Sequence, residues 1–148
     1  MKRSILYLLI FGGVVILGVV AWRVIASNNQ LAGTTDSIQN ITWRWESVTE
    51  QSTKVVTDVP IPNNYTLIFY SDGTLSGQAD CNTFNGAYSE VNGLIITLGA
   101  ITRMYCGETS LDQNYLALLS SVVAGGPDGA GGLALESAGG AQRMLFKK

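Results

Sequence analysis

The stretch from Tyr65 to Gly107 places the strongest constraint on the fold, because it combines strand periodicity, two turn signals and both cysteines of the chain. Apolar residues occupy every second position around Asp72-Gly73, a dipeptide that favours a two-residue hairpin turn because it tolerates positive φ. A similar pattern surrounds Asn92-Gly93. The stretch therefore predicts two antiparallel hairpins with one apolar face. The residues expected on that face are Tyr65, Leu67, Phe69, Leu75, Gly77, Ala79, Leu94, Ile96 and Leu98.

The same alternation predicts the direction of the two cysteines. Cys81 continues the apolar face of the strand that returns from the first turn. Cys106 continues the face of Leu94 if the alternation runs on through Ala100, Thr102 and Met104 without a bulge. Both cysteine side chains are therefore expected to face inward.

Short motifs in this stretch resemble the META domain family, which is also called HslJ-like. They are Asp80-Cys81-Asn82, then Asn85-Gly86-Ala87-Tyr88, then Thr102-Arg103-Met104 followed by Cys106. The segment from Phe69 to Gly77 and the tryptophans Trp43 and Trp45 also fit the family pattern. The resemblance covers about residues 41–147.

This resemblance implies a fold and a cellular setting, but no enzyme activity. Members are small β-rich bacterial proteins that are exported or membrane-associated and are loosely linked to heat stress, envelope stress and drug tolerance. The implied fold is mainly β (α+β), a compact curved antiparallel sheet or partly open β-barrel of about seven or eight strands with one packed α-helix. META-like domains also occur beside lysozyme-inhibitor domains, and their fold resembles that of secretion pilotins.

Residues 1–26 combine a basic start, at Lys2 and Arg3, with a long apolar run. The run from Ile5 to Ile25 is long enough for a transmembrane helix, which needs about 20 residues. The basic start predicts a signal anchor with its N-terminus in the cytoplasm and the rest of the chain outside, in the periplasm or the extracellular space. The alternative is a signal peptide that is cleaved at Val24-Ile25-Ala26 and releases a secreted form.

The soluble domain is expected at residues 41–148, after a polar linker at residues 27–40. Its first strand is predicted at residues 41–48, with Trp43 and Trp45 on the inner face. Residues 50–64 are predicted to form a loop with a short strand around 54–56.

The C-terminal part predicts one helix and a closing hairpin. Ser110 and Gln113 fit a capping box, an apolar stripe follows, and Gly125-Gly126-Pro127 is expected to end the helix. Residues 125–132 then predict a flexible loop. Residues 133–136 and 142–146 predict two paired strands.

The composition excludes several classes of function. The chain has no histidine, which removes Ser-His-Asp triads, Cys-His dyads and most catalytic zinc sites. Three of the nine basic residues and none of the eleven acidic ones lie in residues 1–26, so the remainder has a net charge of −5. Such a balance does not suit a nucleic-acid surface. We therefore expect no cofactor, no metal and no nucleic-acid partner.

Cys81 and Cys106 are the candidate disulfide. An exported chain with two cysteines favours a bridge, because its compartment is usually oxidising. Closing the intervening segment would stabilise the fold by roughly 3–4 kcal/mol in the loop-entropy model. Two buried free thiols, or a redox or metal role, are the alternatives.

Asp80, Asn82 and Arg103 are the candidate polar recognition patch. Alternation places Asp80 and Asn82 opposite Cys81, and Arg103 opposite Cys106, so that Asp80 and Arg103 would approach each other. The alternative is purely structural. Asn82 would then cap a turn, and Asp80 with Arg103 would form a surface ion pair worth about 0–1 kcal/mol.

Together these features predict an exported, membrane-tethered, non-catalytic module that binds an envelope protein or a small ligand, or that supports stress tolerance. One alternative is a pilotin-like assembly component of an envelope complex, which rests on fold analogy. Others are a role like that of a lysozyme inhibitor, or a hydrolytic role. For hydrolysis, the spacing of the candidate carboxylates selects no acid–base pair. These carboxylates are Asp72, Asp80, Glu90 and Glu108.

Overall fold

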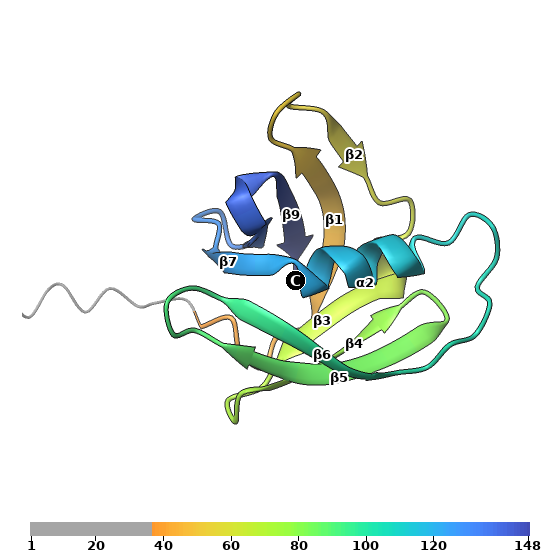
Figure 1. Cartoon of the computed structure of the whole chain (residues 1–148), viewed down its shortest axis with the longest axis horizontal. Coiled ribbons are helices and arrows are strands. Elements are labelled where there is room, and N and C mark those ends of the chain that lie inside the picture. Colours follow the sequence, from red (N-terminus) through yellow and green to blue (C-terminus); the bar gives the residue numbers. More distant parts are fainter. Residues whose placement is uncertain (1–36) are drawn as a thin grey trace, which may run out of the picture. The chain divides into compact units, whose positions relative to one another are not determined.

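The computed structural model describes residues 37–148, which form a curved antiparallel sheet with one short helix (Figure 1). The strands are β1 (Trp43–Glu50), β2 (Val56–Asp58), β3 (Tyr65–Phe69), β4 (Thr74–Ala79), β5 (Asn82–Ser89), β6 (Ile95–Ile101), β7 (Val122–Pro127), β8 (Leu133–Ser137) and β9 (Gln142–Lys147). The α-helix is α2 (Asp112–Ser120), and short 3-10 helices form η1 (Pro62–Asn64) and η2 (Ala138–Gly140). Across residues 37–148, no helix is both long and apolar enough to cross a membrane, and the predicted anchor at residues 1–26 lies outside the described residues.

The sheet curls into a half-barrel. Eight strands follow the order β6-β5-β4-β3-β1-β9-β8-β7, and β2 pairs with β1 beside this path. The two ends of the path lie close together. Gly93, in the loop before β6, is so near β7 that a side-chain Cβ added to it would lie 2.4 Å from the Val123 carbonyl oxygen. α2 contacts β4 and β6. The predicted mainly β fold, a curved antiparallel sheet with one packed helix, is confirmed at this level.

The core consists of the inner faces that the alternation predicted. Trp43 and Trp45 of β1 are 2% and 1% exposed, and the first, third and fifth residues of β3 are also buried. Tyr115 of α2 lies among these rings and stacks on Trp45 with 5.1 Å between ring centroids. Further aromatic contacts join Tyr115 to Tyr65, Phe84 and Phe146. The helix therefore fills the concave side of the sheet with an aromatic side chain.

The Tyr115 hydroxyl gives a first testable prediction. Its ring is fully buried, the oxygen has no hydrogen-bond partner within residues 37–148, and burial raises its pKa well above the usual value. An unpaired buried polar group costs about 1–3 kcal/mol. We therefore expect Tyr115→Phe to leave the free energy of unfolding unchanged or to raise it by about 1 kcal/mol, as measured by urea unfolding.

Tyr65→Phe is the matched control. The Tyr65 hydroxyl accepts a hydrogen bond from the Leu111 backbone N–H at 2.8 Å, so its removal leaves that donor unpaired. We expect this variant to lose about 1–2 kcal/mol. An equal loss in both variants would show that the Tyr115 hydroxyl also has a partner.

The domain begins earlier than the expected boundary at Ile41. Ile38 is 5% exposed and belongs to the core, and its carbonyl oxygen accepts a hydrogen bond from Trp43 Nε1 at 2.8 Å. The Asn40 N–H donates to the Phe69 carbonyl oxygen at 2.7 Å. Residues 37–40 are therefore part of the packed domain rather than of the linker, because an apolar side chain and a backbone bridge secure them.

The chain makes a tight turn at Asp80-Cys81 that the alternation did not predict. Ala79 of β4 pairs directly with Asn82 of β5, and Asp80 takes a positive φ of 58°. Asn64 supports the turn, because its Nδ2 donates to Asp80 Oδ1 at 3.0 Å. The expectation that one strand continues through Cys81 is therefore wrong. Cys81 lies in the turn, and Asn82 rather than Cys81 faces the core.

The first predicted hairpin turn is one residue longer than expected. Phe69 pairs with Leu75, and the Tyr70 N–H donates to the Thr74 carbonyl oxygen, so residues 71–73 form a three-residue loop. Within it only Gly73 has a positive φ, at 84°. Asp72 instead accepts hydrogen bonds from the Thr74 N–H and hydroxyl, which lower the pKa of its carboxyl group.

A bulge between β5 and β6 ends the predicted alternation. Phe84 pairs with Ile101, whereas Gly86 pairs with Leu98, so β6 carries one extra residue between these pairs. Leu94 and Ile96 are buried as expected, but Ile101 takes the inward position that strict alternation gave to Ala100. β6 ends at Ile101, and Cys106 follows in a segment without regular structure.

The C-terminal elements differ from the prediction in two places. The helix begins at Asp112, and Gln113 donates to the Asp112 carboxylate instead of completing a capping box with Ser110. Of the loop expected at residues 125–132, residues 125–127 belong to strand β7, which pairs with β8, and residues 128–132 connect the two strands. A Cβ at Gly125 would lie 2.6 Å from Leu135 Cδ2, so glycine allows the close approach of the two strands. The predicted closing hairpin, now β8 and β9, is confirmed.

Candidate functional site

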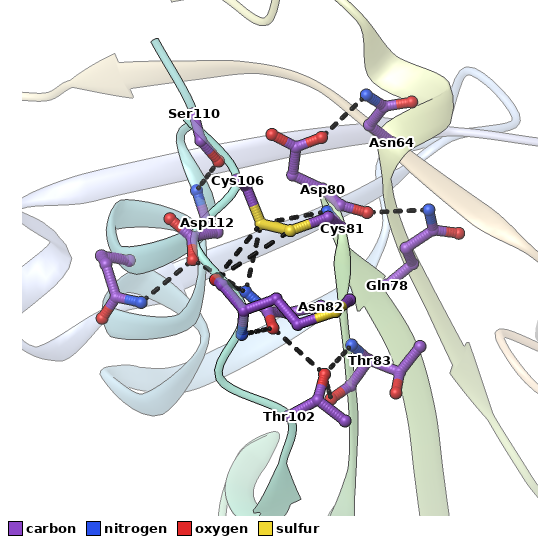
Figure 2. Close-up of a disulfide and its surroundings, with 12 residues drawn as sticks. Asn64, Gln78, Asp80, Cys81, Asn82, Thr83, Thr102, Cys106, Ser110 and Asp112 are labelled. Atoms are coloured by element: carbon purple, nitrogen blue, oxygen red, sulfur yellow. Dashed lines mark hydrogen bonds between the residues drawn. A yellow bond between two sulfur atoms is a disulfide. The ribbon is translucent and has the colours of Figure 1, made fainter. Parts of the chain in front are cut away.

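The cysteine pair forms the expected disulfide (Figure 2). Cys81 contributes from the β4–β5 turn and Cys106 from the segment between β6 and α2, with their Cα atoms 5.5 Å apart. The Cys81 N–H also donates to Cys106 Sγ at 3.3 Å. The bridge therefore fixes the segment after β6 against the end of the neighbouring hairpin.

Asn82 also binds the segment after β6 through side-chain hydrogen bonds. Its side chain is 1% exposed, and its Oδ1 accepts hydrogen bonds from the Met104 N–H at 2.7 Å and the Thr102 hydroxyl at 3.1 Å. Its Nδ2 donates to the Met104 carbonyl oxygen at 3.0 Å. The amide thus binds both backbone groups of Met104, as an adjacent strand would. A segment without strand pairing is held in one conformation as a result.

Asp112 links this network to the helix. Its Oδ2 accepts hydrogen bonds from Asn82 Nδ2 at 3.1 Å and from Gln113 Nε2 at 3.0 Å. Its Cα lies at the start of α2, where a negative charge interacts favourably with the helix dipole. Burial opposes ionisation of this carboxyl group, but the hydrogen bonds from Gln113 and Asn82 outweigh it and lower the pKa.

The three residues of the predicted polar patch have different surroundings in the structure. Asn82 is buried, and Asp80 accepts its hydrogen bond from Asn64. The ion pairs found in the described part of the chain are Arg143–Glu136 and Lys147–Glu46, so Asp80 and Arg103 form none. The expected approach of Asp80 and Arg103 rested on unbroken alternation, which the turn at Asp80 and the bulge in β6 prevent.

A groove with a volume of about 610 Å³ lies between the β6 side and helix α2. Arg103 is the one charged residue of its lining. Met104 and Tyr105 form part of the wall, although they are 58% and 81% exposed. Among residues 37–148, the lining consists of Leu98, Ile101, Thr102, Arg103, Met104, Tyr105, Gln113, Leu116, Ala117 and Ser120. We call this feature the β6–α2 groove.

A family model for the META domain matches residues 36–148. The chain belongs to the META domain family. The curled sheet with its single helix and its Cys81–Cys106 disulfide is therefore the META domain of this chain. A comparison with curated proteins found no match.

Solved structures share the fold of this META domain. An NMR structure of a protein from Burkholderia xenovorans has a TM-score of 0.56 and 21% identity, and the match covers 74% of this chain and 82% of that one. A crystal structure of a DUF4847-family protein from Bacteroides vulgatus has a TM-score of 0.56 and 16% identity, with 78% and 96% covered. These two similarities show the fold alone.

The low pKa of Asp112 predicts how the stability of the META domain depends on pH. A carboxyl group whose pKa is lower in the folded state contributes stability that is fully present above its unfolded pKa, about 3.9, and is lost as the pH falls through the folded value. We expect Asp112→Asn to be less stable than the natural protein at pH 7. The difference between their free energies of unfolding should shrink between about pH 5 and pH 2. A difference that stays constant over this range would contradict an ionised Asp112.

The disulfide of the META domain was predictable from the sequence, but the groove was not. The groove walls come from α2 and from residues 102–105, which have no strand periodicity. One signal was available, since Met104 and Tyr105 are large apolar residues directly before Cys106. Only the turn at Asp80 and the bulge in β6 show that these side chains are exposed.

Proposed function

We propose that this chain is an exported, membrane-tethered, non-catalytic module that binds a polypeptide partner in the β6–α2 groove. The observation that carries this proposal is the exposure of Met104 and Tyr105 in a segment that the disulfide and the Asn82 hydrogen bonds tie to the neighbouring hairpin. Tyrosine is enriched among residues that dominate binding energy, and a preordered loop loses less entropy when it binds.

The location rests on two features. The apolar run at residues 5–25 has the length of a membrane-spanning helix, and a disulfide-bonded domain suits an oxidising compartment outside the cytoplasm. The full-length chain should remain in the membrane fraction after a high-salt wash. Recovery in the soluble fraction would contradict the tether.

The lining of the groove favours binding over catalysis. Its described residues supply apolar, amide and hydroxyl side chains and one guanidinium group, but no carboxylate and no thiol. Carboxylates and thiols are among the usual general acids, general bases and nucleophiles of enzymes, whereas the hydroxyl groups of this lining are weak nucleophiles unless an adjacent base activates them.

Photocrosslinking in cells tests the proposal. A photoreactive amino acid replaces Tyr105 in one full-length chain and Val56 in another, since Val56 is 58% exposed on β2 and lies outside the groove. We expect one dominant protein adduct from position 105 and none from position 56. Equal adducts from both positions would contradict a specific partner at the groove.

Two substitutions on one helix provide a matched control. Ala117 lines the groove, whereas Asn114 is exposed on α2 outside its lining. Ala117→Arg places a long side chain in the groove and should abolish the adduct, while Asn114→Arg should leave it unchanged. An adduct that persists in Ala117→Arg would place the partner elsewhere.

A further inference from the structure

We infer that the β6–α2 groove takes an extended polypeptide segment, which adds as a short strand to the edge of β6 and places a carboxylate against Arg103. This inference rests on the proposed function and specifies the binding mode and the chemistry of the partner. It depends on three features of the groove: the backbone edge, the apolar lining and the charge.

The first feature is an unpaired backbone edge. Among the described strands, β6 ends the strand order and is hydrogen-bonded to β5 alone, although its start lies beside β7. The Tyr88 N–H of β5 donates to the Gly73 carbonyl oxygen, which lies on the β4 side. Opposed residues of an antiparallel pair direct their backbone groups either both toward or both away from each other. Ile96, which pairs with Tyr88, therefore directs its N–H and C=O outward.

The same rule extends along β6 into the groove. Leu98 pairs with Gly86, two residues before Tyr88, and Ile101 pairs with Phe84 beyond the bulge. Both therefore direct their backbone groups outward, and both line the groove. At the bulge, the Ala100 N–H is already bound by Asn85 Oδ1 at 3.0 Å. The available edge is thus short, and it suits a short extended segment rather than a long strand.

The second feature is the apolar lining across from this edge. Leu116 of α2 faces the groove together with the small side chains of Ala117 and Ser120, which leave room beside the helix. The volume of about 610 Å³ lies within the range of roughly 300–1,000 Å³ that is usual for ligand pockets. About four extended residues would span roughly 13 Å along it. Strand addition in such a groove takes affinity from backbone hydrogen bonds and specificity from alternate side chains.

The third feature is charge. Residues 37–148 carry six basic and ten acidic side chains, so the net charge of the domain is −4. Arg103 is the one charged residue of the groove, and it forms no ion pair with another described residue. An acidic side chain on the bound segment would therefore be attracted to one position only, which sets its register.

The test uses synthetic peptides and the full-length chain in detergent micelles. The probe is a fluorescent eight-residue peptide of alternating valine and threonine with one central aspartate. One control peptide carries lysine in place of aspartate, and a second is N-methylated at alternate residues and so cannot complete a β-ladder. We expect the aspartate peptide alone to bind and to slow amide exchange at Ile96, Leu98 and Ile101, as measured by NMR.

Arg103→Glu should weaken binding of the aspartate peptide by at least about tenfold. Lys54→Glu is the charge-matched control, because Lys54 is exposed and lies outside the groove, and it should leave the affinity unchanged. Equal binding of the lysine or the N-methylated peptide, or no binding of the aspartate peptide at millimolar concentration, would overturn the inference.

The two proposals fail in different ways. If the adduct from position 105 forms but is unaffected by Arg103→Glu, and the peptide leaves β6 exchange unchanged, the groove binds a partner by another mode. If no protein adduct forms at position 105, the proposed function itself is contradicted. A crosslinked product with the mass of a small molecule would indicate a small ligand instead of a polypeptide.

Discussion

Replacing both Cys81 and Cys106 with serine is expected to lower the free energy of unfolding by roughly 3–4 kcal/mol. The bridge closes a loop with a sequence separation of 25, so its loss restores the entropy of that loop to the unfolded chain. In a domain of this size the melting temperature should fall by roughly 10–20 °C. Thermal unfolding followed by circular dichroism measures this change.

The reduced natural protein serves as a control for the double variant. It keeps both sulfur atoms but loses the covalent bond, so its melting temperature should fall by a similar amount. A shift of only one or two degrees in both cases would mean that the hydrogen bonds of Asn82 hold the segment without help from the disulfide.

Asn82→Ala is expected to cost roughly 3–5 kcal/mol, the second large effect. The substitution leaves the N–H and C=O of Met104 and part of the Asp112 carboxylate without their partner in a buried site. It also removes the link between α2 and the segment after β6. Urea unfolding at pH 7 measures the loss.

Asn85→Ala is the matched control on the same strand. Asn85 is exposed, and its Oδ1 accepts one hydrogen bond, from the Ala100 N–H. We expect a loss of about 1 kcal/mol or less from this substitution. If the two variants lost the same free energy, the network around Asn82 would not be the main support of the segment.

The inner faces of the strands were predictable because side-chain alternation reports burial directly. Tyr65, Leu67 and Phe69 lie in the core as their spacing indicates, and Trp43 and Trp45 do as well. The disulfide was predictable from the even number of cysteines and the expected oxidising compartment, although the predicted strand at Cys81 is wrong.

The remaining differences have local physical causes that periodicity does not record. Asp80 adopts a positive φ, which aspartate tolerates better than most residues, and the resulting turn reverses the direction assigned to Asn82. One extra residue in β6 shifts Ile101 inward. Gly125 permits the close approach of β7 and β8, whereas in the sequence a run of glycines predicted a loop.

The groove was the least predictable feature, because it depends on all of these deviations together. After the turn at Asp80, the Asn82 side chain binds the backbone of Met104, and β6 ends at Ile101, just beyond the bulge. Met104 and Tyr105 then project from a segment that side-chain hydrogen bonds and a disulfide hold in place. Sequence motifs indicated the cysteines and the asparagine, but not the surface that they support.

Crosslinking from position 105 in chains with and without the disulfide tests most directly whether the rigid segment creates the binding surface. The experiment compares the natural cysteines with the Cys81→Ser, Cys106→Ser variant at a temperature at which circular dichroism shows both to be folded. We expect a dominant protein adduct with the natural cysteines and a loss of most of it in the variant. An equal yield of the same adduct from both folded chains would contradict the proposal that the bridged segment presents the partner site.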